Sequence, residues 1–222
     1  MPGGKRQVSI KSPEDFAEAF NVPRETIHKL VRYVELLAHW QKSTNLIAPS
    51  TLPAIWSRHF ADSAQLRDLA PEARLSLDLG SGAGFPGLVV AILQGGRPDF
   101  RMHLVESNRK KCAFLAEVAR ETEAPVDIHA MRIEDLAQSP HSLVPDVVSA
   151  RALAPLPRLF ELAAPLFGAN TRGLFLKGRE AEVEIEKARR GWAFACRLHP
   201  SLTSTDSSIV EVTGLRPKTS EP

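Results

Sequence analysis

Two hydrophobic patterns divide this chain of 222 residues. Up to about residue 70, apolar side chains recur every three or four positions, which is typical of amphipathic helices. After Pro71, apolar runs of strand length alternate with helical patterns. We therefore predict an all-helical segment over 1–70 and an α/β domain over 71–222, packed together as one compact unit.

Three helices are expected in the first segment. Ser12 and Pro13 resemble the start of a helix that ends near Phe20, because serine caps helix N-termini and proline fits their first turn. A second helix begins at Pro23, and a third runs from Pro53 to about Leu69. The apolar face of the second helix is predicted to contain Ile27, Leu30, Val31, Val34, Leu37 and Ala38.

The alternating part predicts a mainly parallel sheet with helices on both faces. Its first strand is Leu75 to Leu79, and later strands are expected in "RMHLVES", "PVDIHAM", "PDVVSA" and "RGLFLKG". No strong helical pattern separates the last two apolar segments, "WAFACRL" and "SSIVEVTGL". We interpret them as strands that complete the sheet, one of them a candidate for antiparallel pairing.

Composition narrows the class of protein. No apolar run approaches the roughly 18 residues of a membrane span, and the first residues lack the apolar core of a secretory signal, so a soluble cytoplasmic protein is expected. The spacing of Cys112 and Cys196 predicts neither a disulfide framework nor a metal site, and both are expected to be buried as small apolar residues.

The charge distribution is uneven although the net charge is only +2. Residues 1–60 contain 8 Lys/Arg against 5 Asp/Glu, residues 61–150 contain 9 against 13, and residues 151–222 contain 11 against 8. Basic ends around an acidic middle are compatible with a polyanion partner. An ordinary solvated surface with small fluctuations in charge explains the same counts.

The glycine-rich turn after the first strand is the clearest ligand signal. Glycine allows sharp turns and close approach of a ligand, and "LDLGSGAGFPG" fits two templates. Asp78, Gly80, Gly82 and Gly84 give D-x-G-x-G-x-G, which suits a methyl donor carrying an amino acid. Gly82, Gly84 and Gly87 give G-x-G-x-x-G, which suits a dinucleotide pyrophosphate.

Neighbouring residues favour S-adenosylmethionine over NAD. Glu106, at the end of the second strand, suits ribose hydroxyls in either ligand. Pro86 removes a backbone N–H that a pyrophosphate would use, and Phe85 is bulky where phosphates need close approach. After the third strand, Ile133 is a candidate for the face of an adenine and Glu134 for its exocyclic amine; a simple helix-capping role explains Glu134 equally well.

Five segments resemble the bacterial 16S ribosomal RNA guanine-N7 methyltransferases of the glucose-inhibited division protein B family. The resemblance runs from about Tyr33 to Lys177, and the F-P-G ending of the glycine loop together with the R-H-x-x-D-S segment makes it specific. One departure is Ile47, which follows Asn-Leu where threonine is common. The segments are "WQKSTNL" (40–46), "RHFADS" (58–63), "DLGSGAGFPG" (78–87), "VESNRKKCAFL" (105–115), and "SARALAPL" (149–156) followed by "LKG" (176–178).

This resemblance implies a class I S-adenosylmethionine-dependent methyltransferase: a Rossmann-like doubly wound sheet with an N-terminal helical cap. The implied product is 7-methylguanosine in the decoding-region loop of 16S rRNA. The implied partner is this RNA or a precursor of the small ribosomal subunit, and we expect a monomer. By position, the implied cofactor contacts are Gly80, Gly82, Gly84, Phe85, Glu106, Ile133, Glu134 and Arg151.

The expected chemistry needs no catalytic residue. Guanine N7 has a free lone pair at neutral pH, so direct in-line transfer requires neither a base nor a covalent intermediate, and positioning supplies most of the rate. Cys112 lies in a predicted helix and is not expected to be a nucleophile, and no metal is expected. The positioning candidates are Asn45, His59, Arg151 and Lys177, and the substrate-binding candidates are Arg58, His59 and Lys177.

Each candidate also has a structural interpretation. Helical spacing predicts an ion pair between Arg58 and Asp62. Arg151 suits the cofactor, a phosphate, or a salt bridge to an acid at the sheet end, and Lys177 suits an RNA phosphate or a solvated strand end. Phe85 is a candidate for stacking a splayed base, whereas Trp40 and Trp56 are expected to anchor helix packing.

Three other functions stay open at this point. One is a methyltransferase of the same fold that acts on a small molecule, and another is an RNA chaperone that binds the cofactor without activity. The third is a NAD-dependent oxidoreductase. Its short-chain version is excluded, because the only tyrosine is Tyr33 in the helical segment and no Tyr-x-x-x-Lys motif occurs.

Overall fold

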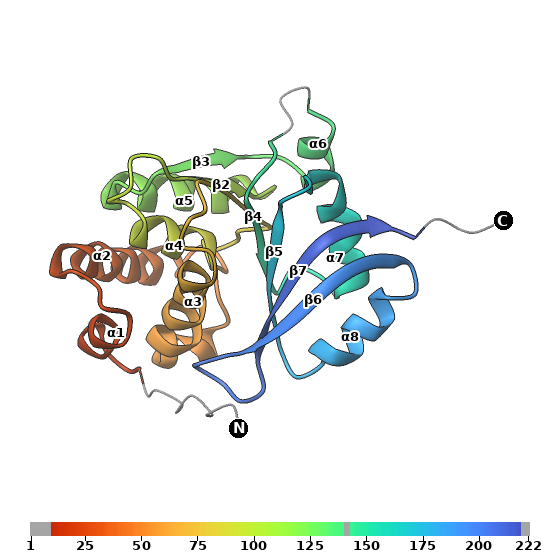
Figure 1. Cartoon of the computed structure of the whole chain (residues 1–222). Coiled ribbons are helices and arrows are strands. Elements are labelled where there is room, and N and C mark those ends of the chain that lie inside the picture. Colours follow the sequence, from red (N-terminus) through yellow and green to blue (C-terminus); the bar gives the residue numbers. More distant parts are fainter. Residues whose placement is uncertain (1–9, 140–142, 219–222) are drawn as a thin grey trace.

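A seven-stranded sheet forms the centre of the computed structural model, which describes residues 10–139 and 143–218 (Figure 1). The strand order is β3-β2-β1-β4-β5-β7-β6. The strands are β1 (Leu75–Leu79), β2 (Arg101–Val105), β3 (Val126–His129), β4 (Val147–Arg151), β5 (Arg172–Lys177), β6 (Trp192–Pro200) and β7 (Ser208–Pro217).

The first five strands are parallel, and β7 is antiparallel to both β5 and β6. This confirms the predicted doubly wound α/β class and the two terminal strands. Strand order reverses at β1 and β4, so the loops after these two strands border the crevice where open α/β sheets bind ligands.

Helices follow the strands as the alternating pattern predicts. α4 and α5 lie on the side of the sheet that also faces the N-terminal helices, and α7 and α8 lie on the other side (Figure 1). The elements are α1 (Pro13–Phe20), α2 (Arg24–Trp40), η1 (Pro49–Ala54), η2 (Trp56–Ala61), α3 (Asp62–Leu69), α4 (Gly87–Leu93), α5 (Arg109–Thr122), α6 (Ile133–Ala137), α7 (Leu156–Ala163), η3 (Ala164–Leu166) and α8 (Ala181–Ala188).

The N-terminal helices begin largely as predicted. Ser12 accepts a hydrogen bond from the Asp15 amide, and the Asp15 carboxylate accepts one from the Ser12 amide, so the two form a capping box. The predicted apolar face of α2 is partly wrong, because Ala38 is exposed whereas Tyr33 and Leu36 are buried. The buried face keeps Leu30 and Leu37 from the prediction and extends to Tyr33 and Leu36.

The predicted third helix is three elements. It begins as the 3₁₀-helix η1, which contains Pro53, continues as the π-helical turn η2, and becomes α-helical only at Asp62. A π-turn adds a residue to the turn and so rotates the side chains that follow it relative to an α-helix. This local change determines which residues of "RHFADS" face the sheet.

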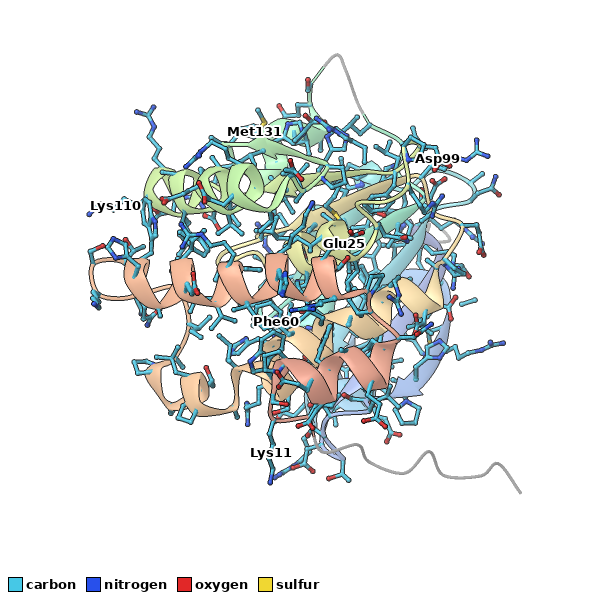
Figure 2. The ribbon with its side chains drawn as sticks, turned by 90° about the vertical axis from the view of Figure 1, so that its left-hand side faces the viewer. Lys11, Glu25, Phe60, Asp99, Lys110 and Met131 are labelled. Atoms are coloured by element: carbon cyan, nitrogen blue, oxygen red, sulfur yellow. The ribbon has the colours of Figure 1, made fainter. Side chains whose placement is uncertain are left out.

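Two hydrophobic clusters cover the two faces of the sheet. One joins α1, α2 and the η1–α3 segment to α4 and α5, and the other joins α6, α7 and α8 to the opposite face. Figure 2 shows Phe60 between the helices, and its ring is fully buried. Apolar contacts therefore cross the predicted boundary at residue 70, which supports our proposal that 1–70 and 71–222 form one compact unit.

The two cysteines differ in burial. Cys112 is buried in α5, as predicted, and its thiol donates to the Glu106 carbonyl oxygen at 3.1 Å. Burial raises the pKa of this thiol, which disfavours the nucleophilic thiolate. Cys196 is only half-buried, so that part of the prediction is wrong; it lies on β6, the edge strand, which has a neighbour on one side only.

Candidate cofactor and substrate site

Asp78 ties the glycine loop, residues 80–86, to the rest of the sheet. It is fully buried near the end of β1; its Oδ1 accepts from the Ser149 hydroxyl at 2.8 Å, and its Oδ2 accepts from the Gly87 amide at 3.3 Å. Burial raises the pKa of this carboxyl to about 6. Asp78 thus connects β1, β4 and α4, and its role in the motif is structural.

Gly84 makes room for the helical cap. Its φ is +90°, in the region that favours glycine, and an added Cβ would collide with the Tyr33 hydroxyl and lie 2.9 Å from the Leu88 Cβ. The Tyr33 hydroxyl donates to the carbonyl oxygen of Ala83. This glycine is therefore needed for contact between α2 and the loop, and its predicted contact with the cofactor stays a prediction.

Gly82 is the glycine of the loop that is open to a ligand. Its φ is +57°, and an added Cβ would meet only the Gly80 carbonyl oxygen, at 3.7 Å. By contrast, a Cβ on Gly80 would lie 2.6 Å from a methyl group of Leu153. Of these motif positions, Gly82 is thus the one where a bound molecule can approach the backbone closely.

Glu106 holds the other side of this opening. The sequence predicted it as the last residue of the second strand; in the structure it is the first residue after β2. Its Oε2 accepts from the Gly82 amide at 3.0 Å, and its Oε1 accepts from the Asn108 amide at 2.7 Å. Each carboxylate oxygen keeps a second lone pair, so the group can still accept from ligand hydroxyls.

Ile133 and Glu134 begin α6, after β3. Ile133 is 8% exposed, and its buried side chain belongs to the core on this face. The Glu134 carboxylate is half-exposed and pairs with the Arg158 guanidinium of α7 at 3.1 Å. Parallel pairing places the ends of β1, β2 and β3 at one edge, so these residues share an edge with Gly82 and Glu106.

Phe85 faces the helical cap. Its ring is only 4% exposed, stacks on Tyr33 with centroids 5.4 Å apart, and meets Phe60 edge-on at the same distance. The prediction that Phe85 stacks a splayed base is therefore wrong, since the cap covers the ring. Its contact with the cofactor stays a prediction.

Arg151, at the end of β4, joins the sheet to the cap. Its Nη1 donates to the Arg58 carbonyl oxygen at 3.0 Å, and its Nη2 donates to His59 Nδ1 at 2.6 Å. The guanidinium carbon lies 5.0 Å from the centre of the Phe85 ring. The same Nη1 is 3.7 Å from Asp62 Oδ2. Arg151 therefore has an acidic partner, but this acid is on α3 and not at the sheet end, as the prediction assumed.

These contacts define the state of His59. A guanidinium has no acceptor, so Nδ1 must use its lone pair and Nε2 must hold the proton. Nε2 then donates to Thr51 Oγ1 at 2.8 Å, and the Thr51 hydroxyl donates to the Ala48 carbonyl oxygen at 2.7 Å. Burial and the charge of Arg151 lower the pKa of His59 to about 3, so the ring is neutral.

The predicted ion pair between Arg58 and Asp62 is wrong. Asp62 faces Arg151, and it also accepts from the hydroxyls of Ser201 and Thr203 at 3.3 and 3.2 Å. Arg58 is exposed and forms no ion pair within 10–139 and 143–218. The π-turn just before Asp62 accounts for the difference, because the prediction assumed regular α-helical spacing.

Lys177 is neither a free cation nor a solvated strand end. Its side chain is 10% exposed, and its Nζ donates to the Ala154 carbonyl oxygen at 2.6 Å and pairs with Glu184 Oε2 at 2.8 Å. Glu184 also accepts from the Leu156 amide at 2.7 Å. The predicted role in holding an RNA phosphate is thus not supported, because α8 neutralises this charge.

A pocket of about 640 Å³ opens beside this cluster, at the carboxyl ends of β4 and β5. The turn that follows Arg151 forms part of its wall, and Ala152 there has a φ of +53°, a strained value for a residue with a side chain. The polar side chains of its lining are those of Thr51, Arg58, His59, Asp62, Arg151, Lys177, Glu184, Ser207 and Ser208.

Of the positioning and substrate-binding candidates, the pocket unites Arg58, His59, Arg151 and Lys177, whereas Asn45 lies elsewhere, exposed before η1. The sequence interpretation missed Thr51, Glu184 and Tyr33 as parts of the site. Tyr33 lies three residues after Leu30, at helical spacing, so its burial was predictable. The sequence contains no comparable signal for Thr51 or Glu184.

Comparisons with known proteins agree on one family. The family model described as rRNA small subunit methyltransferase G matches residues 26–210. A protein named ribosomal RNA small subunit methyltransferase G from Parvibaculum lavamentivorans is 52% identical over 214 residues, 96% of this chain and 94% of that protein. One with the same name from Methylobacterium sp. strain 4-46 is 52% identical, over 90% of this chain and 93% of that protein.

Solved structures support the fold. The O-methyltransferase TomG from Streptomyces achromogenes, in complex with SAM, has a TM-score of 0.61 at 16% identity, covering 95% of this chain and all of that one. An O-methyltransferase from Bacillus cereus, in complex with SAH, has a TM-score of 0.57 at 15% identity, covering 82% and 90% of the two chains. At these identities the likeness extends to the fold alone.

The packing at Gly84 predicts a specific loss of stability. Gly84→Ala should lower the free energy of unfolding by about 2 to 4 kcal/mol, because the methyl group meets Tyr33 and Leu88 at a strained φ. Gly96→Ala is the control, since no atom lies within 4 Å of its added Cβ. Urea unfolding measures both, and equal small effects would contradict this account of the loop.

The neutral state of His59 predicts a pH effect. The unfolded chain protonates His59 below pH 6.5 and the folded chain does not until about pH 3, so its contribution to stability is lost as pH falls through this window. The stability gap between wild type and His59→Asn should therefore shrink by about 2 to 3 kcal/mol from pH 7 to pH 4.5, at roughly 1.4 kcal/mol per pH unit.

Urea unfolding at several pH values measures this gap. His28→Asn is the matched control, because it makes the same substitution at an exposed histidine, on α2. Asp78 has a raised pKa and so changes stability with pH in the opposite direction to His59. Because the wild type and both variants contain Asp78, its effect cancels in each comparison. A gap for His59→Asn that stays constant down to pH 4.5 would show that His59 is not held neutral.

Proposed function

The chain belongs to the rRNA small subunit methyltransferase G family, and from this premise we propose that it methylates N7 of one guanine in the decoding-region loop of 16S rRNA. One observation carries the proposal: an open glycine position next to the carboxylate of Glu106 lies at the same sheet edge as a pocket large enough for a purine.

The residues at this edge fit S-adenosylmethionine, which supplies an electrophilic methyl group on a sulfonium. Gly82 leaves space for the ligand against the loop, and the spare lone pairs of Glu106 accept from ribose hydroxyls. Ile133 offers an apolar contact to the adenine, and Glu134 lies beside it as a candidate for the exocyclic amine. Gly80, Gly84 and Phe85 shape the loop through their contacts with Leu153 and Tyr33.

The pocket suits a base that becomes positively charged. Methylation at N7 leaves a cation, which unpaired cations in the wall would destabilise. Arg151 is near Asp62, Lys177 is paired with Glu184, and His59 is neutral. The inner wall therefore presents polar groups whose charges are balanced, and Arg58 at the exposed rim is its unpaired cation within the described residues.

Direct in-line transfer follows from the chemistry of the base. The N7 lone pair needs no general base, so the chain contributes position and exclusion of water, which can supply roughly 7 to 11 kcal/mol of the barrier. Cys112 cannot serve as a nucleophile towards the pocket, because its thiol donates to the Glu106 carbonyl and lies outside the lining. The proposed mechanism has no covalent enzyme intermediate.

Unpaired cations near the cofactor edge support an RNA substrate. Lys42, after α2, and the first three residues of α5, Arg109, Lys110 and Lys111, form no ion pairs in the described chain. Figure 2 shows Lys110 at the edge of the molecule, near the end of α2 that is farther from Glu25. At the other end of this helix pair, Lys29 and Arg32 are neutralised by Glu123 and Glu121.

A polyanion gains from this arrangement, because phosphates bind free cations without breaking existing ion pairs. A small-molecule substrate would have no use for cations outside the pocket. We propose that the protein acts as a monomer in the cytoplasm, where ribosomal particles are assembled. None of the described helices is long and apolar enough to cross a membrane.

The proposed activity can be tested with purified protein, labelled S-adenosylmethionine, and 16S rRNA or 30S subunits from a strain that lacks this modification. We expect label at one guanine, detected by chemical cleavage at 7-methylguanosine. Absence of label from both substrates, or label at another atom of the base, would overturn the proposal.

Two variants test the cofactor edge by calorimetry, separately from the transfer assay. Glu106→Ala removes the proposed ribose acceptor and the contact with Gly82. Because charged hydrogen bonds are lost, the affinity for S-adenosylmethionine, measured by calorimetry, should fall about tenfold or more. Glu123→Ala removes an exposed acid at the far end of α5 and should leave that affinity unchanged.

A further inference from the structure

The two carboxylates in the wall of the candidate substrate pocket differ in how far the protein already uses them. Asp62 Oδ1 accepts from the hydroxyls of Ser201 and Thr203 at 3.3 and 3.2 Å, and its Oδ2 lies 3.7 Å from the Arg151 guanidinium. Asp62 thus has a protein partner at both oxygens, whereas Glu184 has partners at only one. Glu184 is therefore the acid to consider as a ligand for the substrate.

The Oε2 atom of Glu184 is fixed by two donors. It accepts from the Leu156 amide at 2.7 Å and pairs with Lys177 Nζ at 2.8 Å. Leu156 begins α7, and the first amides of a helix have no acceptor within it. Glu184 of α8 supplies this missing acceptor, and the two contacts set the orientation of its carboxylate.

The Oε1 atom of Glu184 stays open. No group within 10–139 and 143–218 donates to it, and no buried polar side-chain atom in these ranges lacks a partner, so Oε1 is accessible to solvent. Lys177 also has a donor to spare, because an ammonium carries three N–H groups and Ala154 and Glu184 account for two of them. The ion pair therefore offers the pocket one donor and one acceptor side by side.

A donor beside an acceptor distinguishes guanine from adenine. Guanine presents O6 as an acceptor and, beside it, N1–H and the N2 amine as donors, whereas adenine presents the N6 amine beside the acceptor N1 and has no N2 amine. Bases splayed out of RNA loops are read on this edge. N7 lies on a different edge of the ring, so contacts with O6 and N2 leave it uncovered for methyl transfer.

We propose that the Lys177–Glu184 pair selects the target base: Lys177 donates to O6, and Glu184 Oε1 accepts from N1–H and the N2 amine of guanine. The proposal rests on the proposed function for its substrate, and it assigns the residues that recognise that substrate. Glu184 also contributes to the rate. Methylation at N7 makes the ring cationic and its N–H groups stronger donors, so a carboxylate binds the transition state more tightly than the neutral base.

The first test measures the affinity of the full chain for guanosine and inosine 5′-monophosphates by NMR titration, with S-adenosylhomocysteine present. Inosine monophosphate keeps O6, N1–H and N7 and lacks only the N2 amine. The wild type should bind guanosine monophosphate about tenfold more tightly, because the inosine nucleotide loses a hydrogen bond to a charged group. Adenosine monophosphate, in which donor and acceptor are reversed, should bind more weakly than either.

Glu184→Gln should remove this preference. The Leu156 amide and Lys177 are both donors, so the glutamine oxygen must face them and the NH2 group must face the pocket. An NH2 group cannot accept from N2, so the tenfold preference should fall to about one. Glu182→Gln is the matched control and should keep the preference, because Glu182 is exposed on the same helix.

The second test is the single-turnover rate of methyl transfer to 16S rRNA. Glu184→Gln should slow transfer at least tenfold at saturating RNA and leave the affinity for S-adenosylmethionine unchanged, and Glu182→Gln should match the wild type. Inosine in place of the target guanosine should slow the wild type about tenfold and add little to the effect of Glu184→Gln, because both changes remove the same contact. A merely structural role for Glu184 would make the two effects multiply.

The outcomes are distinct. A wild type that binds the guanosine and inosine nucleotides equally would overturn the proposal. So would a Glu184→Gln variant that keeps the tenfold preference, because Glu184 would then act only through the packing of α7 and α8. The nucleotide titration requires no methyl transfer, so recognition can fail while activity on 16S rRNA holds, and activity can fail while recognition holds.

Discussion

The hydrogen bond between Arg151 and His59 is the contact on which the site depends. It connects the end of β4 to the helical cap, and it requires a neutral imidazole that accepts at Nδ1 and donates to Thr51. The same guanidinium lies over Phe85, whose ring stacks on Tyr33 of α2. One buried cation thus aligns the cap, the glycine loop and the wall of the substrate pocket.

Charge balance distinguishes the interior of the site from its surroundings. Within the pocket, Arg151 and Lys177 each have a carboxylate nearby, which suits the formation of a cationic base. Outside it, Lys110 near the cofactor edge and Arg216 at the far end of the sheet have no acidic partner within the described ranges. Under the proposed function, this arrangement would separate attraction of the RNA backbone from stabilisation of the reacting ring.

The sequence predicted what local patterns control. Alternating periodicity gave the sheet, and the glycine loop with Glu106 gave one edge of the site. The errors came from contacts between residues distant in sequence. Lys177 is neutralised by Glu184 of α8, and the cap buries Phe85. The π-turn before Asp62 breaks the regular spacing on which the predicted ion pair with Arg58 depended. None of these partners is specified by a local motif.

The role of Arg151 is tested most directly by the single-turnover rate of methyl transfer to 16S rRNA in Arg151→Lys, at saturating S-adenosylmethionine. A lysine cannot donate to the Arg58 carbonyl and His59 in the same planar geometry, so the account predicts at least a tenfold slower transfer with the cofactor affinity largely retained. A rate equal to that of the wild type would contradict it, because the pocket would then not depend on this contact.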